Sequence, residues 1–289
     1  MAKILDYINL IRVRQWYKNL VIFLALFFIA QLFNAELMVL ATLGFIALCL
    51  ASSANYIIND LIDLPKDKLN PEKKHRPLAS GVISKPAAII LAAILLILSL
   101  TLSYSLERWF FYSIIGLIVL TQIYSLWLKE IIFADILSIA TLFVIRAISG
   151  ALLIDVKISP WLILCPFFLS LFLSVGKRHS EITLLKEKSG DTRKVLQEYN
   201  HGLTNSLMII STTLLIISYA LYSFLSEHKN LLFTLPFALY VIFRFYYLIS
   251  TGSEIARHPE KVIKDKAMML GMALWVLITL TIIYGILFS

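Results

Sequence analysis

The feature that most restricts how this chain can fold is the repeated occurrence of apolar segments about 20 residues long. A helix of that length crosses the hydrocarbon core of a bilayer. Hydrophobic residues make up 60% of the 289 positions and charged residues only 15%, whereas soluble domains carry roughly 25% charged residues. Lipid offers no hydrogen-bond partners to the backbone N–H and C=O groups, so each spanning segment should be a complete helix. The sequence therefore predicts a polytopic, all-α membrane protein. Its nine transmembrane helices are expected at 18–34, 37–60, 87–106, 109–128, 132–154, 159–178, 205–226, 230–250 and 267–288.

The distribution of Lys and Arg predicts the orientation of these spans. Outside the spans, almost all of these residues lie in alternate loops on the side of the N-terminus, and the opposite loops hold only Arg108, Lys157 and Lys229. The positive-inside rule places the basic side, and with it the N-terminus, in the cytoplasm. The net charge of +8 is then concentrated on one face, where it also attracts anionic membrane lipids. We expect a single transmembrane domain over 1–289 in the plasma membrane, with no nucleic-acid partner. A homo-oligomer is compatible with the sequence.

The first residues follow a different pattern from the spans. Ile4, Leu5, Ile8 and Ile11 recur at helical spacing, charged residues lie between them, and aromatic residues follow. Such a pattern is typical of an amphipathic helix that lies in the membrane interface. We therefore expect residues 1–16 to form an interfacial helix.

Two of the predicted cytoplasmic loops, 61–86 and 179–204, are long and polar. They follow the second and the sixth predicted span, so they occupy equivalent places four spans apart. This arrangement suggests a pseudo-repeat with one pocket between the two loops.

A cluster of oxygen-bearing side chains lies where the second span meets the first of these loops. On a helix, Asn59 and Asp63 share one face, and Asp60 lies three residues before Asp63. Pro65 should end or kink the helix, so Asp67 is expected just past it, folded back toward the others. Mg²⁺ takes one or two carboxylates and completes its shell with water and substrate phosphate. We predict that Asn59, Asp60, Asp63 and Asp67 hold Mg²⁺. The alternative is a solvated loop whose charges have no role.

The acidic cluster is part of a wider pattern. Asn59-Asp60-x-x-Asp63-x-x-x-Asp67, the nine spans and the second polar loop resemble the UbiA superfamily of intramembrane prenyltransferases. Other stretches resemble one branch of that superfamily, the decaprenyl-phosphate phosphoribosyltransferases. These stretches are Arg14-Gln15-Trp16-Tyr17-Lys18-Asn19, Tyr124-Ser125-Leu126-Trp127-Leu128-Lys129, Arg146-Ala147-Ile148-Ser149-Gly150, Ser159-Pro160-Trp161 and Gly176-Lys177-Arg178-His179-Ser180-Glu181. The resemblance runs from Arg14 to about Trp275 and implies a UbiA-like helical bundle.

The later polar loop departs from the pattern of typical prenyltransferases. Those enzymes resemble one another in a second Asp-x-x-x-Asp motif, which holds a second Mg²⁺ on the prenyl diphosphate. Here Asp191 stands alone, because position 195 is Val. The same region offers the cations Lys177, Arg178, Arg193 and Lys194. Cations in place of carboxylates can bind phosphate directly. This favours a donor with an additional phosphate, such as phosphoribosyl diphosphate, and an acceptor that is itself a phosphate.

The resemblance thus implies transfer of phosphoribose from 5-phosphoribosyl 1-diphosphate to a polyprenyl phosphate, such as decaprenyl phosphate, with release of diphosphate. Mg²⁺ would neutralise the leaving group, so Asp60, Asp63 and Asp67 are the expected catalytic residues. The acceptor phosphate is already anionic near neutral pH and needs no strong general base. The expected substrate-binding residues are Arg14, Lys18, Asn59, Lys73, Arg76, Arg146, Lys177, Arg178, Glu181 and Tyr199.

Several of these residues also have a structural interpretation. Arg14 and Lys18 could anchor the first span at the interface. Arg146 lies within a span, where a charge is costly and usually faces the interior or a cavity. Its expected partner is Asp135 or a substrate phosphate. Tyr199 could contact ribose or cap its loop.

Two other functions fit part of the pattern. A UbiA-type prenyltransferase would move a polyprenyl group from prenyl diphosphate to an aromatic or glycerol-phosphate acceptor. The absent second aspartate pair and the Arg-Gln-Trp-x-Lys-Asn start count against it. A transporter or lipid flippase would also carry buried charges. It predicts polar residues in both halves of the bilayer, whereas here they gather at the predicted cytoplasmic side.

Overall fold

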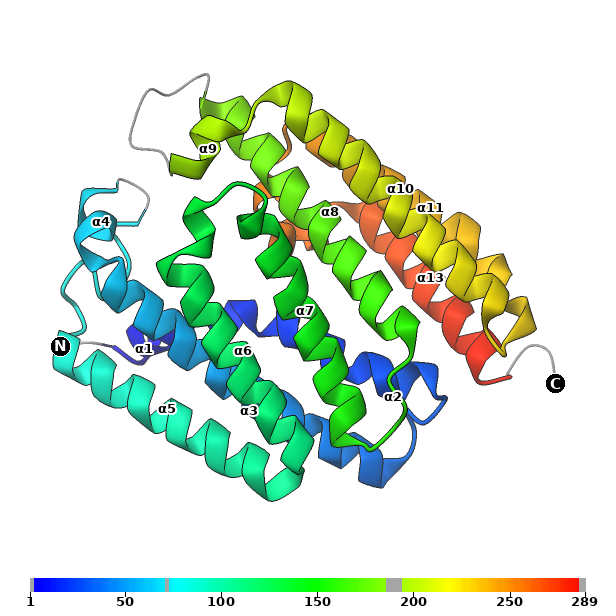
Figure 1. The fold of residues 1–289 in the computed structure, drawn as a ribbon, viewed down its shortest axis with the longest axis horizontal. Helices are drawn as coiled ribbons and strands as arrows, with labels where there is room; N and C mark the ends of the chain where they lie inside the picture. Colours follow the sequence, from blue (N-terminus) through cyan, green and yellow to red (C-terminus); the bar gives the residue numbers. More distant parts are fainter. Residues whose placement is uncertain (1–2, 71–72, 186–193, 286–289) are drawn as a thin grey trace. The chain divides into compact units, whose positions relative to one another are not determined.

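The computed structural model describes residues 3–70, 73–185 and 194–285, and all regular elements in these ranges are helices (Figure 1). The α-helices are α1 (Ile4–Ile11), α2 (Leu24–Phe28), α3 (Ala35–Ile62), α4 (Leu64–Leu69), α5 (Lys85–Leu106), α6 (Arg108–Leu126), α7 (Ala134–Leu153), α8 (Pro160–Leu185), α9 (Lys194–Glu198), α10 (His201–Leu225), α11 (Leu235–Ser250), α12 (Glu254–Arg257) and α13 (Lys266–Ile283). The 3-10 helices are η1 (Val13–Phe23), η2 (Leu128–Glu130), η3 (Lys229–Thr234) and η4 (Pro259–Lys264). The predicted all-α class is confirmed.

Within the described residues, eight helices are long and apolar enough to cross a membrane. They are α3, α5, α6, α7, α8, α10, α11 and α13. The predicted count of nine is not confirmed, because the segment 18–34 is divided between η1 and α2. Asn19, in the middle of η1, is buried and contacts Cys49 and Ser52 of α3 through its side chain. Just after α2, Ala30 adopts a left-handed conformation with φ 57°.

The interfacial helix is shorter than the predicted range 1–16. It ends before Arg12, which adopts the left-handed conformation with φ 54° and turns the chain from α1 into η1. Ile4 and Leu5 are exposed, whereas Leu10 is buried, and α1 packs against α3. The buried residue Leu10 does not belong to the predicted apolar face, and the interfacial position of α1 stays a prediction.

Backbone contacts divide the chain into two compact units. The first comprises Met1–Leu128 and Ile145–Ile158, and the second comprises Lys129–Val144 and Ser159–Ser289. Helix α7 contributes residues to both. Each unit has its own hydrophobic core, and the prediction of one transmembrane domain stays a prediction.

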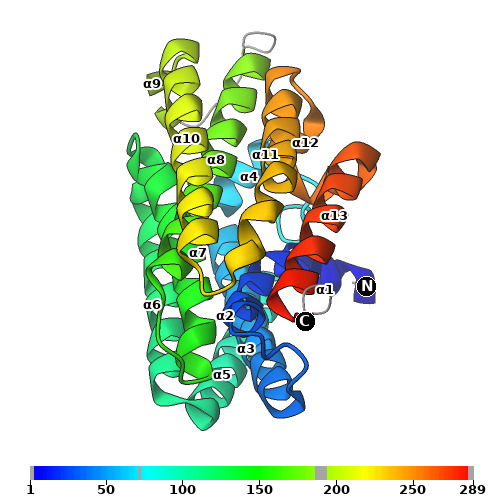
Figure 2. The ribbon, with the colours of Figure 1, turned by 90° about the vertical axis from the view of Figure 1, so that its right-hand side faces the viewer.

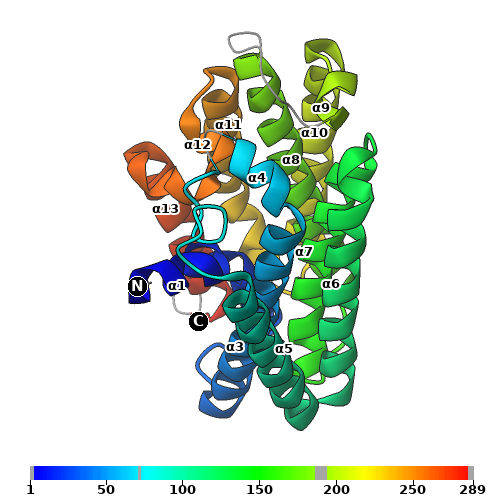
Figure 3. The same cartoon turned by 90° about the vertical axis from the view of Figure 1, so that its left-hand side faces the viewer.

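In the first unit, α3 lies along α5, and α5 turns back into α6 (Figures 1 and 3). The contact face of α3 is built from small residues, since Ala47, Ala51 and Ala54 are completely buried. Small side chains let membrane helices approach closely. Ser99 of α5 donates a hydrogen bond across this contact to the carbonyl oxygen of Ala47 at 2.8 Å. The close packing fixes the end of α3 that carries the acidic cluster.

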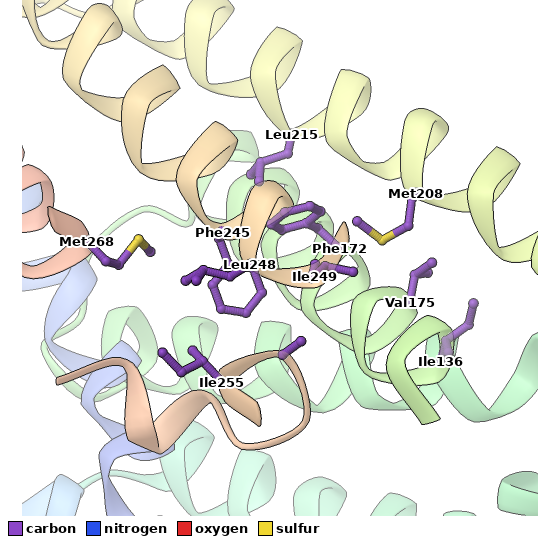
Figure 4. Close-up of a cluster of buried hydrophobic side chains, with 11 residues drawn as sticks. Ile136, Phe172, Val175, Met208, Leu215, Phe245, Leu248, Ile249, Ile255 and Met268 are labelled. Carbon is purple, nitrogen blue, oxygen red and sulfur yellow. The ribbon is translucent and has the colours of Figure 1, made fainter. Parts of the chain in front are cut away.

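In the second unit, α8 packs against α10, and α11 pairs with α13 (Figure 2). The core of this unit is drawn in Figure 4, where Phe172 of α8 and Phe245 of α11 meet with ring centroids 5.7 Å apart. Met208 of α10 and Ile255 of α12 pack into the same cluster. This core includes Val175 and therefore fixes the part of α8 that directly precedes Lys177.

The break between α3 and α4 differs from the prediction in one respect. Helix α3 ends at Ile62, and Pro65 lies in the first turn of α4. Backbone N–H groups in the first turn have no partner within the helix, so the missing N–H of proline costs no hydrogen bond there. Asp67 therefore lies within a second short helix, whereas the sequence placed it just past a helix end.

Helix α8 continues to Leu185, beyond the predicted end of the span at residue 178. Lys177, Arg178 and Glu181 consequently lie on a helix, and the prediction that a loop begins at 179 is wrong. The salt bridge between Arg178 and Glu181, three residues apart on one face, stabilises this extension. Residues 186–193, which include Asp191 and Arg193, lie outside the described residues.

Candidate active site

Two carboxylates of the predicted acidic motif share one guanidinium group in the first unit. Asp60 of α3 and Asp67 of α4 are only 4% and 2% exposed. Nη1 of Arg76 donates to Asp60 Oδ1 at 2.9 Å and to Asp67 Oδ2 at 2.6 Å. Charge-assisted hydrogen bonds of this kind are the strong ones in proteins. The break at Pro65 does bring Asp67 back toward Asp60, and Arg76 from the following loop joins the two.

A second guanidinium group reaches the same cluster from the N-terminal part of the chain. Nη2 of Arg12 donates to Asp60 Oδ1 at 2.5 Å, and its Cζ lies 5.0 Å from the centroid of the Tyr56 ring, within the range of a cation–π interaction. The sequence placed Arg12 only on the polar face of the interfacial helix. Its position two residues before the start of the Arg-Gln-Trp-x-Lys-Asn stretch was the available signal.

Two further predicted residues belong to this part of the first unit. Lys73 Nζ lies 3.6 Å from Asp67 Oδ1. The side-chain Oδ1 of Asn59 is buried and has no hydrogen-bond partner. A buried acceptor without a partner is costly, and an amide oxygen is a ligand that hard cations accept. Asn59 thus has the property expected of a ligand-binding residue.

The oxygen atoms of this cluster are of the kind that Mg²⁺ binds. Among the described residues, no group of three or more His, Cys, Asp or Glu side chains is placed to hold a metal ion. Two carboxylates and the unpartnered oxygen of Asn59 nevertheless suit Mg²⁺, which usually completes its shell with water and substrate phosphate. The residues fit an ion that binds together with a phosphate ligand.

Asp63 marks the junction of the two helices. It caps the C-terminus of α3 and precedes α4, and its carbonyl oxygen accepts the N–H of Asp67 at 2.9 Å. Its backbone therefore orients Asp67. The role of its carboxylate as a metal ligand stays a prediction.

The remaining basic residues predicted in the first unit lie on η1 and α7. Arg14 is exposed and Lys18 is half-buried. Arg146 is only 8% exposed, and its Nε donates to Asn19 Oδ1 at 2.9 Å. The structure thus joins α7 to η1 through a buried arginine and asparagine. Asn19 was not among the predicted site residues.

The predicted pairing of Arg146 with Asp135 is wrong. Both residues lie on α7, and eleven residues along an α-helix correspond to about 16 Å, which is too far for contact. Asp135 instead pairs with Arg178 of α8, whose Nε donates to Asp135 Oδ2 at 2.7 Å. The helical rise alone could have excluded the predicted pair.

Asp135 is the centre of a second buried network, within the second unit. The Tyr199 hydroxyl donates to Asp135 Oδ1 at 2.8 Å and accepts the N–H of Phe133 at 3.1 Å. Nη1 of Arg178 donates to Glu181 at 2.6 Å. Asp135, Arg178 and Tyr199 are 0%, 2% and 4% exposed. Burial, followed by the hydrogen bond to Asp135, raises the pKa of Tyr199 above its ordinary value. This tyrosine is accordingly a protonated donor at neutral pH.

Lys177 differs from its neighbour Arg178 in exposure. Its side chain is 48% exposed and lies 4.0 Å from Glu181, whereas the side chain of Arg178 is 3% exposed. Lys177 can therefore contact a ligand from solution, and Arg178 is enclosed by protein groups.

Comparison with known proteins adds an independent result. Residues 19–254 match the model of the UbiA prenyltransferase family. The chain is 29% identical over 287 residues to the decaprenyl-phosphate phosphoribosyltransferase of Mycolicibacterium smegmatis, covering 93% of this chain and 89% of that protein. It is 29% identical over 289 residues to the protein of the same name from Corynebacterium glutamicum, covering 96% and 86%.

A solved structure has the same fold. It is a UbiA homolog from Archaeoglobus fulgidus bound to GPP and Mg²⁺, with a TM-score of 0.70 over 94% of this chain and 99% of that chain. The sequence identity is 18%, so this likeness concerns the fold alone.

Proposed function

This chain belongs to the UbiA prenyltransferase family, and from this premise we propose that it transfers phosphoribose from 5-phosphoribosyl 1-diphosphate to a polyprenyl phosphate such as decaprenyl phosphate. It is a membrane-embedded transferase. Diphosphate is the second product, and Mg²⁺ is the proposed cofactor. The names of the phosphoribosyltransferase relatives support this choice of substrates.

The observation that carries the proposal is the charge arrangement of the first unit. Two buried carboxylates are surrounded by three cationic side chains, Arg12, Lys73 and Arg76. A divalent cation with a diphosphate presents both kinds of charge. The carboxylates suit the cation, and the arginine and lysine side chains suit the phosphate oxygens.

The proposed reaction forms a bond between an oxygen of the acceptor phosphate and the anomeric carbon C1 of the ribose. The bond between C1 and the diphosphate oxygen breaks, and its electron pair leaves with diphosphate. Held by Asp60, Asp67 and Asn59, Mg²⁺ would stabilise the charge that develops on this leaving group. Arg76 and Lys73 bind the diphosphate or the 5-phosphate. No side chain has to remove a proton, because the acceptor is already anionic. Direct displacement inverts the configuration at C1.

Other residues have proposed roles that follow from their exposure. Lys177 is the proposed phosphate-binding residue of the second unit, because its side chain is exposed. Arg178 and Tyr199 are proposed positioning residues, since buried hydrogen bonds hold them. Arg14 and Lys18 are the proposed ligands of the lipid phosphate. The basic loops support a location of the proposed site at the cytoplasmic face of the plasma membrane.

The test compares two donors in membranes that contain the protein. One sample receives labelled phosphoribosyl diphosphate with decaprenyl phosphate, and the other receives labelled prenyl diphosphate with an aromatic acid. We expect label in the lipid product of the first sample only, and none with the Asp60→Asn variant. Incorporation in the second sample alone would replace this proposal with prenyl transfer.

A further inference from the structure

Arg12 reaches Asp60 from a backbone that is held in place. Ser53 of α3 donates a hydrogen bond to the carbonyl oxygen of Ile11 at 2.8 Å and accepts one from Trp16 Nε1 at 3.0 Å. The chain is thus tied to α3 on both sides of Arg12. The side chain of Arg12 can therefore change partners while its backbone keeps its place.

The cations and the carboxylates of this cluster differ in exposure. The side chains of Arg12 and Arg76 are 26% and 31% exposed, whereas those of Asp60 and Asp67 are 5% and 3% exposed. A ligand that approaches from outside meets the guanidinium groups before the carboxylates. Both arginines also donate to the same atom, Asp60 Oδ1, so Asp60 keeps one cationic partner when Arg12 leaves.

We propose that Arg12 is an exchangeable counter-cation of Asp60. It neutralises the carboxylate when no metal is bound, and it moves to a phosphate oxygen when a divalent cation and a diphosphate bind together. The exchange changes no covalent bond and conserves charge, because the divalent cation replaces the guanidinium at Asp60 and the guanidinium pairs with the diphosphate. The inference rests on the proposed function only in requiring a metal–diphosphate ligand.

The exchange gives Arg12 opposite effects on two ligands. A divalent cation alone must displace Arg12 from Asp60 and is repelled by its charge, so Arg12 weakens its binding. A cation that arrives with diphosphate offers Arg12 a new anionic partner, so Arg12 strengthens binding of the complex. An arginine with a purely structural role would not produce effects of opposite sign.

The experiment uses the full chain purified in detergent and two probes, Mn²⁺ alone and the premixed Mn²⁺–diphosphate complex. Mn²⁺ accepts the same oxygen ligands as Mg²⁺ and is detected by electron paramagnetic resonance. For Arg12→Gln we expect Mn²⁺ alone to bind about tenfold more tightly and the complex about tenfold more weakly, where tenfold corresponds to about 1.4 kcal/mol.

Arg244 provides a matched control in the second unit. Its side chain is 31% exposed and pairs with Asp265 at 2.8 Å, and its Cζ lies 5.2 Å from the ring centroid of Tyr247. Arg244→Gln should leave both affinities within about twofold of wild type, because the exchange needs the acidic pair. Arg12→Lys keeps the charge but loses the forked donor geometry. It should bind Mn²⁺ alone as the wild type does and bind the complex more weakly.

Several results would overturn the proposal. They are a wild type that binds neither probe, an Arg12→Gln variant that binds Mn²⁺ alone no more tightly than wild type, and one that binds the complex unchanged. If Arg12→Gln does not fold, Arg12→Lys provides the test. An Arg12→Lys variant that binds the Mn²⁺–diphosphate complex as tightly as wild type would then reject the exchange. If the affinities change in opposite directions but membranes transfer no phosphoribose, the exchange stands and the proposed function fails, because any diphosphate donor carries the probed group.

Discussion

Each of the two units buries a carboxylate that accepts hydrogen bonds from arginine, and the two clusters differ in how far they are closed. In the first unit, the arginine side chains at Asp60 are 26% and 31% exposed. In the second unit, the side chains of Asp135 and Arg178 are 0% and 3% exposed, and the Tyr199 hydroxyl occupies the other carboxylate oxygen. Partners that reach the surface can be exchanged for a ligand, whereas enclosed partners have a structural role.

The largest expected effect is a difference in unfolding free energy between variants of the two clusters. Asp135→Ala leaves the enclosed Arg178 without its carboxylate, and breaking a buried pair in this way costs about 3–5 kcal/mol. Asp60→Ala leaves arginines that can turn toward water, so we expect a loss of about 1 kcal/mol or less. Denaturant unfolding in one detergent measures both. Equal losses at the two sites would remove the distinction.

For transfer activity, we expect the first cluster to matter more than the second. Asp60→Asn keeps the size of the side chain but removes the charge that a divalent cation needs, so we expect transfer to fall by roughly 10²–10³-fold, the loss typical of one lost electrostatic contact to developing charge. The variant should stay folded, as judged by its unfolding midpoint. A rate above about one tenth of wild type would argue against a role of Asp60 in binding the metal–diphosphate.

The next prediction concerns the close contact between α7 and η1 in the first unit. A Cβ at Gly150 of α7 would collide with the backbone carbonyl of Ile22 in η1, while a Cβ at Gly116 of α6 meets no atom within 4 Å. Gly150→Ala should cost about 1–3 kcal/mol through overpacking. Gly116→Ala should be neutral or stabilise by up to about 1 kcal/mol. Thermal unfolding of both variants would detect the difference, and a neutral Gly150→Ala would show that η1 can shift.

The smallest effect should come from the hydroxyl of Tyr199. Tyr199→Phe removes one hydrogen bond to Asp135 and one from Phe133, for a loss of about 1–2 kcal/mol. The raised pKa of Tyr199 means that the folded state favours the protonated form. Its stabilisation is complete below the ordinary pKa of 10.0 and is lost as the pH rises through the folded value. The gap between wild type and variant should therefore shrink in alkaline solution, and a constant gap would place the hydroxyl outside the network.

The sequence predicted those features that depend on local pattern. Apolar length located the membrane helices, and the spacing of Asp60 and Asp67 around Pro65 located the acidic pair. The predicted span at 18–34 is not confirmed, and this segment includes contacts of Asn19 with α3 that hydropathy does not reveal. The end of α8 was misplaced for a similar reason, since Arg178 is neutralised by Asp135 on another helix.

Long-range contacts account for the pairings that sequence reasoning missed. Arg12 lies 48 residues before Asp60, and Tyr199 lies 64 residues after Asp135. No periodicity connects positions so far apart, so only the fold can bring them together. The pattern of the chain thus locates the acidic residues, and the structure supplies their cationic partners.

The most direct test of the central claim, that Asp60 and Asp67 bind a divalent cation, is a change of metal preference. Membranes with wild type or Asp67→Cys are stripped with EDTA, and transfer of labelled phosphoribose is measured after Mg²⁺ or Cd²⁺ is returned. Thiolate ligands favour softer ions than Mg²⁺. We expect Mg²⁺ to restore the wild type, and Cd²⁺ but not Mg²⁺ to restore the variant. A wild type that stays active in EDTA, or an Asp67→Cys variant that works fully with Mg²⁺, would contradict the claim.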